Sequence, residues 1–249
     1  MDGGVALVEG LLSGSGLSAA ALARRAGVSG STLHRILNGQ VDPSVGTLRE
    51  VAIACGYQLT LAPVQLSDPL AAAAARTLLE GGYEPPADPE LGRWQARLIR
   101  IAGGEDPVQI VQAAADACVP LARVGGVLYG GAISLGRLAS AGAASGGQWA
   151  ISGAAGLYLP QSGDLAPAVT ILWCEDVRAV GHLLTGSGLF PAARDDQVAV
   201  AVLPAEPQLF AGAFTRGIVR YAAPIQIALD CLSQQAPVSV DALQEISSW

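Results

Sequence analysis

The side chains with the most distinctive chemistry in this chain fall on one predicted helix near residue 30. They are short or forked hydrogen-bond donors that are expected to face outward from that helix: Ser31, Thr32, His34, Arg35 and Asn38. Donors with so little apolar surface can enter the major groove of DNA and reach the edges of the bases. Their spacing therefore indicates sequence-specific recognition of DNA.

The flanking residues show how such a helix would be held. Leu33, Ile36 and Leu37 repeat at the spacing that buries one face of a helix. Ser29 is a good N-cap, and Asn38-Gly39 ends the helix. The sequence thus predicts a short helix with an apolar inner face and a polar outer face.

Neighbouring helices complete the expected bundle. The preceding helix is capped by Ser18 and stops at Gly27, so two helices meet at a tight turn. The following helix begins at Ser44 and can close the core with one set of apolar residues: Val45, Leu48, Val51, Ala52 and Cys55. A first helix is expected over residues 5–12, and residues 58–64 are expected to be extended.

This bundle resembles the helix-turn-helix domain of the phage-repressor (Cro-like, XRE-type) family over residues 3–61. The matching segments are LSAAALARRAGVS for the first helix and turn, STLHRILNG for the recognition helix, and DPSVGTLREVAIACGY for the next helix. The resemblance implies a small DNA-binding domain in which the second helix of the helix-turn-helix pair lies in the major groove.

The resemblance also implies which residues contact DNA. The groove-facing residues would be Gly30, Ser31, Thr32 and Arg35. The residues near phosphates would be Ser18, Arg24, Arg25, Asn38 and Gln40. With the N-cap Ser29 and the outward His34, these residues form the predicted DNA-binding surface. A helical hairpin that binds no DNA is the alternative interpretation.

The composition excludes several catalytic classes. All 14 basic residues are arginine, so a Walker A loop, a pyridoxal enzyme and any Schiff-base mechanism lack their lysine. His34 and His182 are the two histidines, which excludes multi-histidine metal sites. The four cysteines form no CxxC pair, so reduced thiols are expected, with Cys174 the candidate if one is reactive. No cofactor is predicted.

The net charge of −7 is unevenly divided. Residues 1–65 carry four arginines and four acidic residues, whereas the rest carries ten arginines and seventeen acidic residues. Counterion release depends on local phosphate contacts, so DNA binding is compatible with this balance. One copy with so few arginines is expected to bind weakly, which favours a homodimer on two half-sites of a palindromic operator.

No membrane partner is expected. The apolar stretch 124–136 is too short to span a bilayer, and the N-terminus lacks the basic start of a signal peptide. The sequence therefore predicts a cytoplasmic protein.

The chain is expected to divide into a helix-turn-helix domain over 1–64, a helical linker region over 65–105 and an α/β regulatory or partner-binding domain over 106–249. Asp68-Pro69 and Asp106-Pro107 are predicted helix starts. Within the last part, residues 121–144 are expected to be helical in part and residues 149–155 to begin a helix. Buried strands are expected over 168–173 and 198–203.

A second resemblance covers roughly residues 90–245. The segments WAISGAAGLYL, AVTILW, VAVAVLPAE and IVRYAAPIQIALDCL, above all the run from Tyr221 to Asp230, resemble the C-terminal domain of the abortive-infection antitoxin (AbiEi-type) regulators. The resemblance implies a nucleotidyltransferase fold without catalytic residues, in cytoplasmic regulators that bind their own promoters and oppose a toxin. The N-terminal domain differs from the winged helix usual in that family.

Two sets of residues imitate catalytic groups. Thr185–Gly188 followed by Asp195-Asp196 imitates a nucleotidyl-transfer motif, but adjacent carboxylates on a strand point to opposite faces and cannot share a metal. A hydrolase would need His182 with Asp176 or Asp164, and no GxSxG motif is present. The sequence therefore predicts that the protein is not an enzyme.

Together these observations predict an α+β protein, with an all-α helix-turn-helix bundle followed by a mixed α/β domain that resembles a catalytically inactive nucleotidyltransferase. The predicted function is a sequence-specific transcription regulator, acting as a repressor, whose second half dimerises or senses an effector. The alternative is an antitoxin of a type IV-like toxin-antitoxin system. The predicted partners are double-stranded DNA, a second copy, and a small-molecule effector or a toxin protein.

Overall fold

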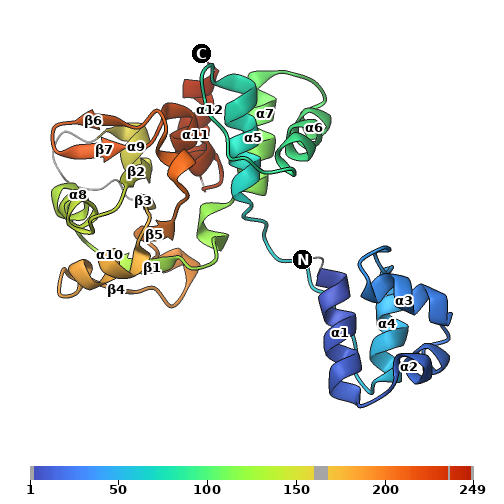
Figure 1. The fold of residues 1–249 in the computed structure, drawn as a ribbon. Coiled ribbons are helices and arrows are strands. Elements are labelled where there is room, and N and C mark those ends of the chain that lie inside the picture. Colours follow the sequence, from blue (N-terminus) through green and yellow to red (C-terminus); the bar gives the residue numbers. More distant parts are fainter. Residues whose placement is uncertain (1–2, 160–167, 235, 248–249) are drawn as a thin grey trace. The chain divides into compact units, whose positions relative to one another are not determined.

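The computed structural model describes residues 3–159, 168–234 and 236–247, with the backbone alone at Asp195. The chain forms two compact units, Met1–Val64 and Gln65–Trp249, each with its own core (Figure 1). The α+β class expected from the sequence is confirmed, with a helical N-terminal unit and a C-terminal unit built on a sheet.

All secondary-structure elements described in the first unit are helices. Its elements are α1 (Gly3–Ser15), α2 (Ala19–Arg25), α3 (Gly30–Leu37) and α4 (Val45–Ala54). Helix α1 is longer than the expected 5–12, since the Gly- and Ser-containing segment after Leu12 continues the helix. Residues 58–64 form no strand.

One apolar cluster holds the first unit together. Each of the helices contributes to it, and its best buried side chains are at most 1% exposed: Val8, Leu22, Leu33, Ile36 and Val51. Burying a side chain of this size stabilises a fold by about 1.5–3 kcal/mol. The inner stripe predicted for residues 29–38 is therefore the face of α3 that anchors it.

The second unit begins with three helices, α5 (Pro69–Leu79), α6 (Leu91–Ala102) and α7 (Pro107–Ala117). Their alanine-rich faces pack with Trp94, Leu98 and Leu229 into one buried cluster. Residues 65–105 therefore differ from the expected linker region: they form part of the core of the second unit. The backbone of Asp68 also donates to the carbonyl of Ala117 at 2.9 Å, which fixes the entry of α5 beside the end of α7.

The rest of the second unit surrounds a sheet. Its helices are α8 (Leu135–Ala144), α9 (Ala154–Tyr158), α10 (Val177–Leu184), α11 (Pro224–Leu232) and α12 (Val238–Ile246). Its strands are β1 (Val127–Gly131), β2 (Trp149–Gly153), β3 (Thr170–Cys174), β4 (Leu189–Pro191), β5 (Val200–Pro204), β6 (Phe214–Arg216) and β7 (Val219–Tyr221). Short 3-10 turns lie at η1 (Pro120–Ala122), η2 (Asp195–Gln197) and η3 (Pro207–Phe210).

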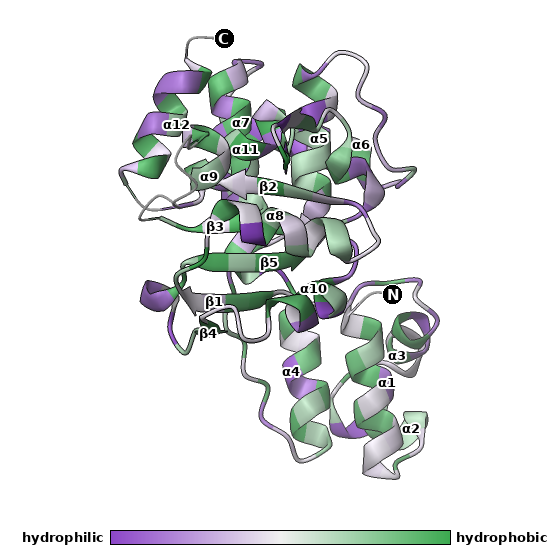
Figure 2. Ribbon diagram, turned by 90° about the vertical axis from the view of Figure 1, so that its left-hand side faces the viewer, coloured by the Kyte–Doolittle hydropathy of each residue, from purple (hydrophilic) through white to green (hydrophobic). Residues whose placement is uncertain are grey.

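Among the described residues the strands form one mixed sheet of seven, in the order β4-β1-β5-β3-β2-β7-β6. Its centre pairs β3 parallel to β5, from Thr170 opposite Val200 to Cys174 opposite Pro204, and antiparallel to β2. The central strands β3 and β5 consist mostly of hydrophobic residues (Figure 2), and all but the last residue of β5 are buried, as expected where both faces of a sheet are covered. Helices α8 and α10 contact one another and the sheet, whereas α9 and α11 pack together against β2.

The expectation of a helix over 149–155 is wrong. Residues Trp149–Gly153 form the fully buried strand β2, and the helix α9 begins only at Ala154. The segment WAISG consists largely of small residues, which pack equally well in a buried strand or a helix. Its long-range contacts decide the outcome, because Trp149 packs on Gly142 of α8 and Ser152 bonds to Asp230 of α11.

No single described helix is long and apolar enough to cross a membrane. Helices α1 and α2 taken together meet the criteria of length and composition, but they are bent by 103° at their junction.

Candidate nucleic-acid interface

The turn between α2 and α3 sets the angle between the two helices. Gly27 adopts a left-handed conformation with φ of +65°, which favours glycine because a Cβ would be strained there. The amide of Val28 donates back across this turn to the carbonyl of Ala23 at 3.0 Å. The predicted stop at Gly27 is confirmed, and α3 begins at Gly30.

Helix α3 separates its faces sharply. Leu33 and Ile36 are 1% exposed, whereas Ser31, Arg35 and Asn38 form an exposed stripe along the other side. Of the eleven residues predicted to contact DNA, Thr32 is half-buried and the others are exposed. A Cβ built on Gly30 meets no atom within 4 Å, so the backbone at the start of α3 is open to an approaching molecule.

Ser29 organises the start of α3. Its Oγ accepts a hydrogen bond from the amide of Thr32 at 3.0 Å and lies 3.0 Å from Ser31 Oγ and 2.7 Å from Thr32 Oγ1. The hydroxyls of Ser31 and Thr32, predicted as outward donors, therefore form one bonded group with Ser29. The signal for this was the spacing of hydroxyl residues two and three positions after an N-cap serine. A hydroxyl rotates easily, so Ser31 and Thr32 can exchange this partner for a base or a phosphate.

His34 and Asn38 form a second bonded pair on the outer face. Asn38 Nδ2 donates to the carbonyl of His34 at 2.8 Å and lies 3.0 Å from His34 Nε2. The two side chains are therefore in hydrogen-bond contact across one turn of the helix. The amide group of Asn38 also closes the end of α3, so a phosphate contact by its nitrogen would replace one of these bonds.

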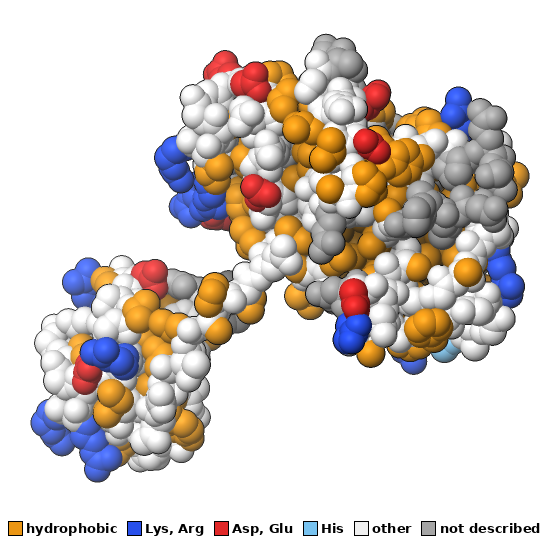
Figure 3. All heavy atoms as spheres, turned by 180° about the vertical axis from the view of Figure 1, so that it is seen from behind, with side chains coloured by type: hydrophobic (Ala, Val, Ile, Leu, Met, Phe, Trp, Pro, Cys, Tyr) orange, Lys and Arg blue, Asp and Glu red, His pale blue; other side chains and the backbone are white. Residues whose placement is uncertain are grey.

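The arginines of the first unit differ in their partners. Arg49 lies 3.5 Å from the carboxylate of Glu50. Within the described residues of the unit, Arg24, Arg25 and Arg35 form no ion pair or side-chain hydrogen bond, and all three are exposed. Arginine side chains stand out in blue on the surface of this unit, the smaller one in Figure 3. These three guanidinium groups are therefore available for phosphate oxygens or guanine edges.

Ser18 and Gln40 lie at the ends of this surface. Ser18 Oγ accepts from the amide of Ala21 at 3.2 Å, so it caps α2 as predicted. Helix N-termini with exposed amides favour anions, and phosphate contacts by backbone amides and hydroxyls are frequent in protein–DNA interfaces. Gln40 is exposed just beyond α3. Its backbone N–H donates to the carbonyl of Arg35 at 2.9 Å.

The described residues that imitate catalytic groups have local structural partners. Asp196 lies in η2, where Arg194 Nε donates to its carboxylate at 2.9 Å. Asp176 caps α10 by accepting from the amide of Ala179 at 2.8 Å, and His182 is exposed on that helix. Asp164 lies outside the described residues. Ser187 is buried at 8% exposure, and its Oγ accepts from the amide of Leu189 at 3.4 Å.

The thiol of Cys174 is shielded. Cys174 is fully buried, and burial together with the nearby Asp176 raises its pKa to about 12. A thiolate is the reactive form of cysteine, so this environment makes Cys174 unreactive at neutral pH. Among the described residues no group of three or more His, Cys, Asp and Glu side chains could hold a metal ion.

A comparison with protein families agrees with this surface. Residues 13–63 match a family model described as a helix-turn-helix domain, which spans α2, α3 and α4. No curated protein and no solved structure matches the chain. The first unit therefore contains a helix-turn-helix domain, which indicates a DNA-binding regulator.

Proposed function

We propose that the protein is a sequence-specific transcription regulator that binds double-stranded DNA in the cytoplasm through the outer face of α3. The observation that carries the proposal is the exposed stripe of Ser31, Arg35 and Asn38 on a helix whose other face is buried, within a helix-turn-helix domain. In this mode Arg35 reads a base edge, with the hydroxyls of Ser31 and Thr32 beside it.

The charge of the first unit supports a dimer. Its four arginines are balanced by four acidic residues, and Arg49 is paired with Glu50, so one copy offers few phosphate contacts. Two copies on a palindromic operator double the number of contacts and of base-reading helices. We therefore propose that the protein acts as a homodimer and, by occupying a promoter, as a repressor.

For the second unit we propose regulation and not catalysis. The polar groups that imitate a catalytic set have structural partners: Asp176 caps a helix and Asp196 pairs with Arg194. Dimerisation and effector sensing are the roles proposed for this unit. The resemblance to abortive-infection antitoxins stays a prediction, and rescue of growth on co-expression with a neighbouring toxin gene would test it.

The proposal is tested by titrating the full chain onto the DNA upstream of its own gene and onto a random duplex at several salt concentrations. Arg35→Ala is expected to weaken operator binding by about 1–3 kcal/mol, or roughly 5- to 150-fold, with a much smaller loss on random DNA. Arg49→Ala serves as the matched control: it removes the same charge outside α3, so any loss of affinity should be small and equal for operator and random DNA.

Two outcomes would overturn the assignment. Equal losses on operator and random DNA for Arg35→Ala would remove its base-reading role. Absence of binding to any duplex at low ionic strength would refute the regulator itself.

A further inference from the structure

The second unit contains a pocket with a volume of about 800 Å³. Its walls come from α5, the segment that follows α5, the segment 118–124, the ends of β3 and β5, and Gln226 of α11. Sites for organic ligands typically enclose about 300–1,000 Å³ and combine apolar walls with a few fixed polar groups. This pocket lies entirely within residues 68–226, away from the helix-turn-helix domain in the chain.

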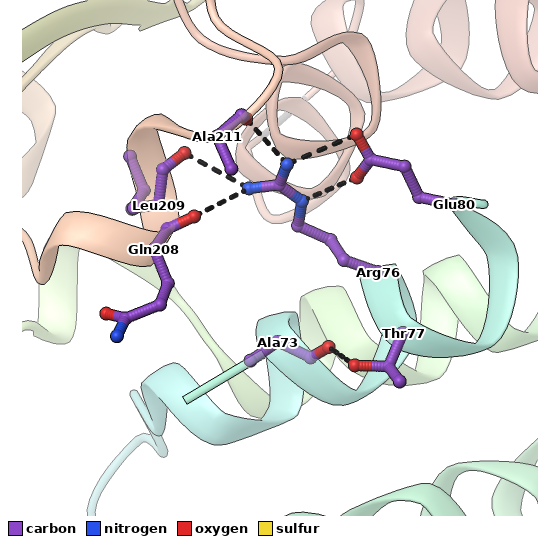
Figure 4. A network of polar contacts seen from close by, with 7 residues as sticks. All are labelled: Ala73, Arg76, Thr77, Glu80, Gln208, Leu209 and Ala211. Atoms are coloured by element: carbon purple, nitrogen blue, oxygen red, sulfur yellow. Dashed lines mark hydrogen bonds and ion pairs between the residues drawn. The ribbon is translucent and has the colours of Figure 1, made fainter. Parts of the chain in front are cut away.

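One of the two arginines that line the pocket is fully committed to the fold. Arg76 is 1% exposed and donates to both carboxylate oxygens of Glu80, at 2.7 and 3.2 Å. It also donates to the carbonyls of Gln208, Leu209 and Ala211, at 3.3, 3.1 and 2.7 Å (Figure 4). These bonds use all five N–H donors of the guanidinium group, so Arg76 fastens α5 to η3 and has nothing left for a ligand.

Arg123, the other arginine of the pocket, has no such partners. Its guanidinium lies 5.5 Å from the centre of the Trp173 ring, and its buried Nε has no hydrogen-bond partner. Within the described residues no carboxylate lies within ion-pair distance of it. Burial lowers its pKa from the ordinary value, although the charges of Asp230 and Asp68 act to raise it. A half-buried guanidinium without an acceptor is stabilised by a carboxylate, which can accept from two of its N–H groups at once.

Hydrogen bonds to one buried carboxylate connect the wall behind Arg123. Trp173 and Gln226 both line the pocket and both donate to the buried carboxylate of Asp230, at 2.7 and 2.9 Å. Ser152 donates to the same carboxylate, so this aspartate is held by three donors. The ring that lies under Arg123 is therefore held by a hydrogen bond within the core, and Arg123 itself lines the pocket.

The rim of the pocket carries the opposite charge. Asp88, Glu175 and Glu206 line it and are exposed, and the half-buried Asp68 lines it as well. Asp68 accepts from Trp94 Nε1 at 3.0 Å, and Asp88 and Glu175 each accept from one backbone amide at 2.8 Å, which leaves Glu206 without a side-chain hydrogen bond in the described structure. A simple anion would be attracted by Arg123 but repelled by this rim. A simple cation would be attracted by the rim but repelled at Arg123. A molecule with both charges satisfies both regions.

The lining also includes rings with apolar faces. These include one tyrosine ring and the flat faces of several prolines: Pro69, Tyr83, Pro86, Pro204 and Pro207. Such surfaces suit an apolar side chain, and proline and aromatic rings lose little conformational entropy when a ligand packs on them.

We propose that this pocket binds a zwitterion of the amino-acid type, with its carboxylate on Arg123, its ammonium group among the rim carboxylates and an apolar side chain against the prolines and Tyr83. A free amino acid and a short peptide share this chemistry, and the volume accommodates either. The binding itself is independent of DNA recognition, whereas a role as the effector site rests on the proposed function.

The first test uses the full chain and measures its melting temperature and binding heat with free apolar amino acids and with di- and tripeptides that carry apolar side chains. Binding to the folded state raises the melting temperature. For each compound that binds, its N-acetylated and C-terminally amidated forms are compared, and blocking either end is expected to weaken binding at least tenfold. Preference for free amino acids or for peptides then identifies the source.

Variants locate the site. Arg123→Gln is expected to abolish binding, Arg123→Lys to retain part of it because the charge stays but the fork is absent, and Glu206→Gln to weaken it. Arg137→Gln is the matched control, since Arg137 is exposed on α8 and does not line the pocket. If Arg123→Gln does not fold, the affinity of Arg123→Lys and the affinities of the acetylated and amidated compounds test the proposal.

The outcomes are distinct from those for DNA binding. Arg35→Ala should bind the zwitterion with unchanged affinity, whatever its effect on DNA. The pocket proposal is overturned if no compound of either class binds the wild-type chain at millimolar concentration. It is also overturned if the amidated and acetylated forms bind as well as the parent compound, or if a folded Arg123→Gln variant retains full affinity.

Discussion

Arg35 of the first unit and Arg76 of the second occupy opposite environments. Arg35 is exposed and forms no ion pair in the described structure, whereas Arg76 is 1% exposed and uses all its donors on Glu80 and three backbone carbonyls. An exposed charge keeps its hydration, so it costs little free energy when it has no partner. A buried charge loses that hydration and must form hydrogen bonds or ion pairs within the fold. The arginines of the first unit are therefore exposed, whereas the second unit uses Arg76 to hold its fold together.

The difference extends to acidic residues. In the second unit Asp230 is fully buried and accepts from Ser152, Trp173 and Gln226. The buried residues of the first unit's core are all apolar. Charged residues of the first unit thus lie on its surface, where they can contact DNA. In the second unit some charged residues also stabilise the fold. Three changes test this difference between the two units.

The largest effect is expected for Arg76→Met. Removing one partner of a buried charged network costs about 3–5 kcal/mol, because Glu80 and the carbonyls around it lose their donors. Urea unfolding of the full chain should show this loss in the transition of the second unit. Arg100→Met, on the exposed face of α6, should change the free energy of unfolding by less than about 0.5 kcal/mol. Similar small losses for both variants would contradict the structural role of Arg76.

The next effect concerns pH and Asp230. Burial raises the pKa of Asp230 from 3.8 to about 6, although its three hydrogen bonds and Arg123 act to lower the pKa. The folded state therefore binds the proton more tightly than the unfolded state. This group contributes stability below pH 3.8 that is lost as pH rises to about 6, on the order of 3 kcal/mol in all. The buried thiols of Cys118 and Cys231 stay neutral over this range because burial raises their pKa values.

Asp230→Asn should remove this component of the pH dependence. An asparagine can keep the bonds from Ser152 and Trp173 on its carbonyl oxygen, and Gln226 can rotate its amide to accept from the new nitrogen. The measurement is the free energy of unfolding of both proteins between pH 4 and pH 8. Parallel curves for the variant and the wild type would show that Asp230 titrates normally.

The smallest effect is expected at the surface of the first unit. Arg24→Ala combined with Arg25→Ala should weaken binding to all duplexes alike and reduce the slope of log affinity against log salt by about 1 for each phosphate that an arginine no longer neutralises. Fluorescence anisotropy at several salt concentrations measures this slope. An unchanged slope would show that neither arginine reaches a phosphate. The stability of the first unit should stay the same, since neither side chain has a partner in the described structure.

The first unit could be predicted closely because its signals are local. Ser18, Ser29 and Ser44 cap α2, α3 and α4 as expected, since an N-cap depends only on residues two or three positions away. The apolar stripe of α3 is likewise fixed by helical spacing. What the sequence did not show was the bonding of Ser29 to Ser31 and Thr32, which depends on the side-chain rotamers adopted at the start of α3.

In the second unit the sequence determined less. Asp68 and Asp106 start α5 and α7 as predicted, because capping is local. Tertiary structure alone decided that Trp149–Gly153 is a strand, since small residues carry weak propensity and the sheet supplies the missing hydrogen bonds. It also decided that Arg76 is saturated while Arg123 is not. The two residues are the same amino acid, so the sequence alone does not distinguish them. The acceptors that each arginine contacts depend on the segments that fold around it.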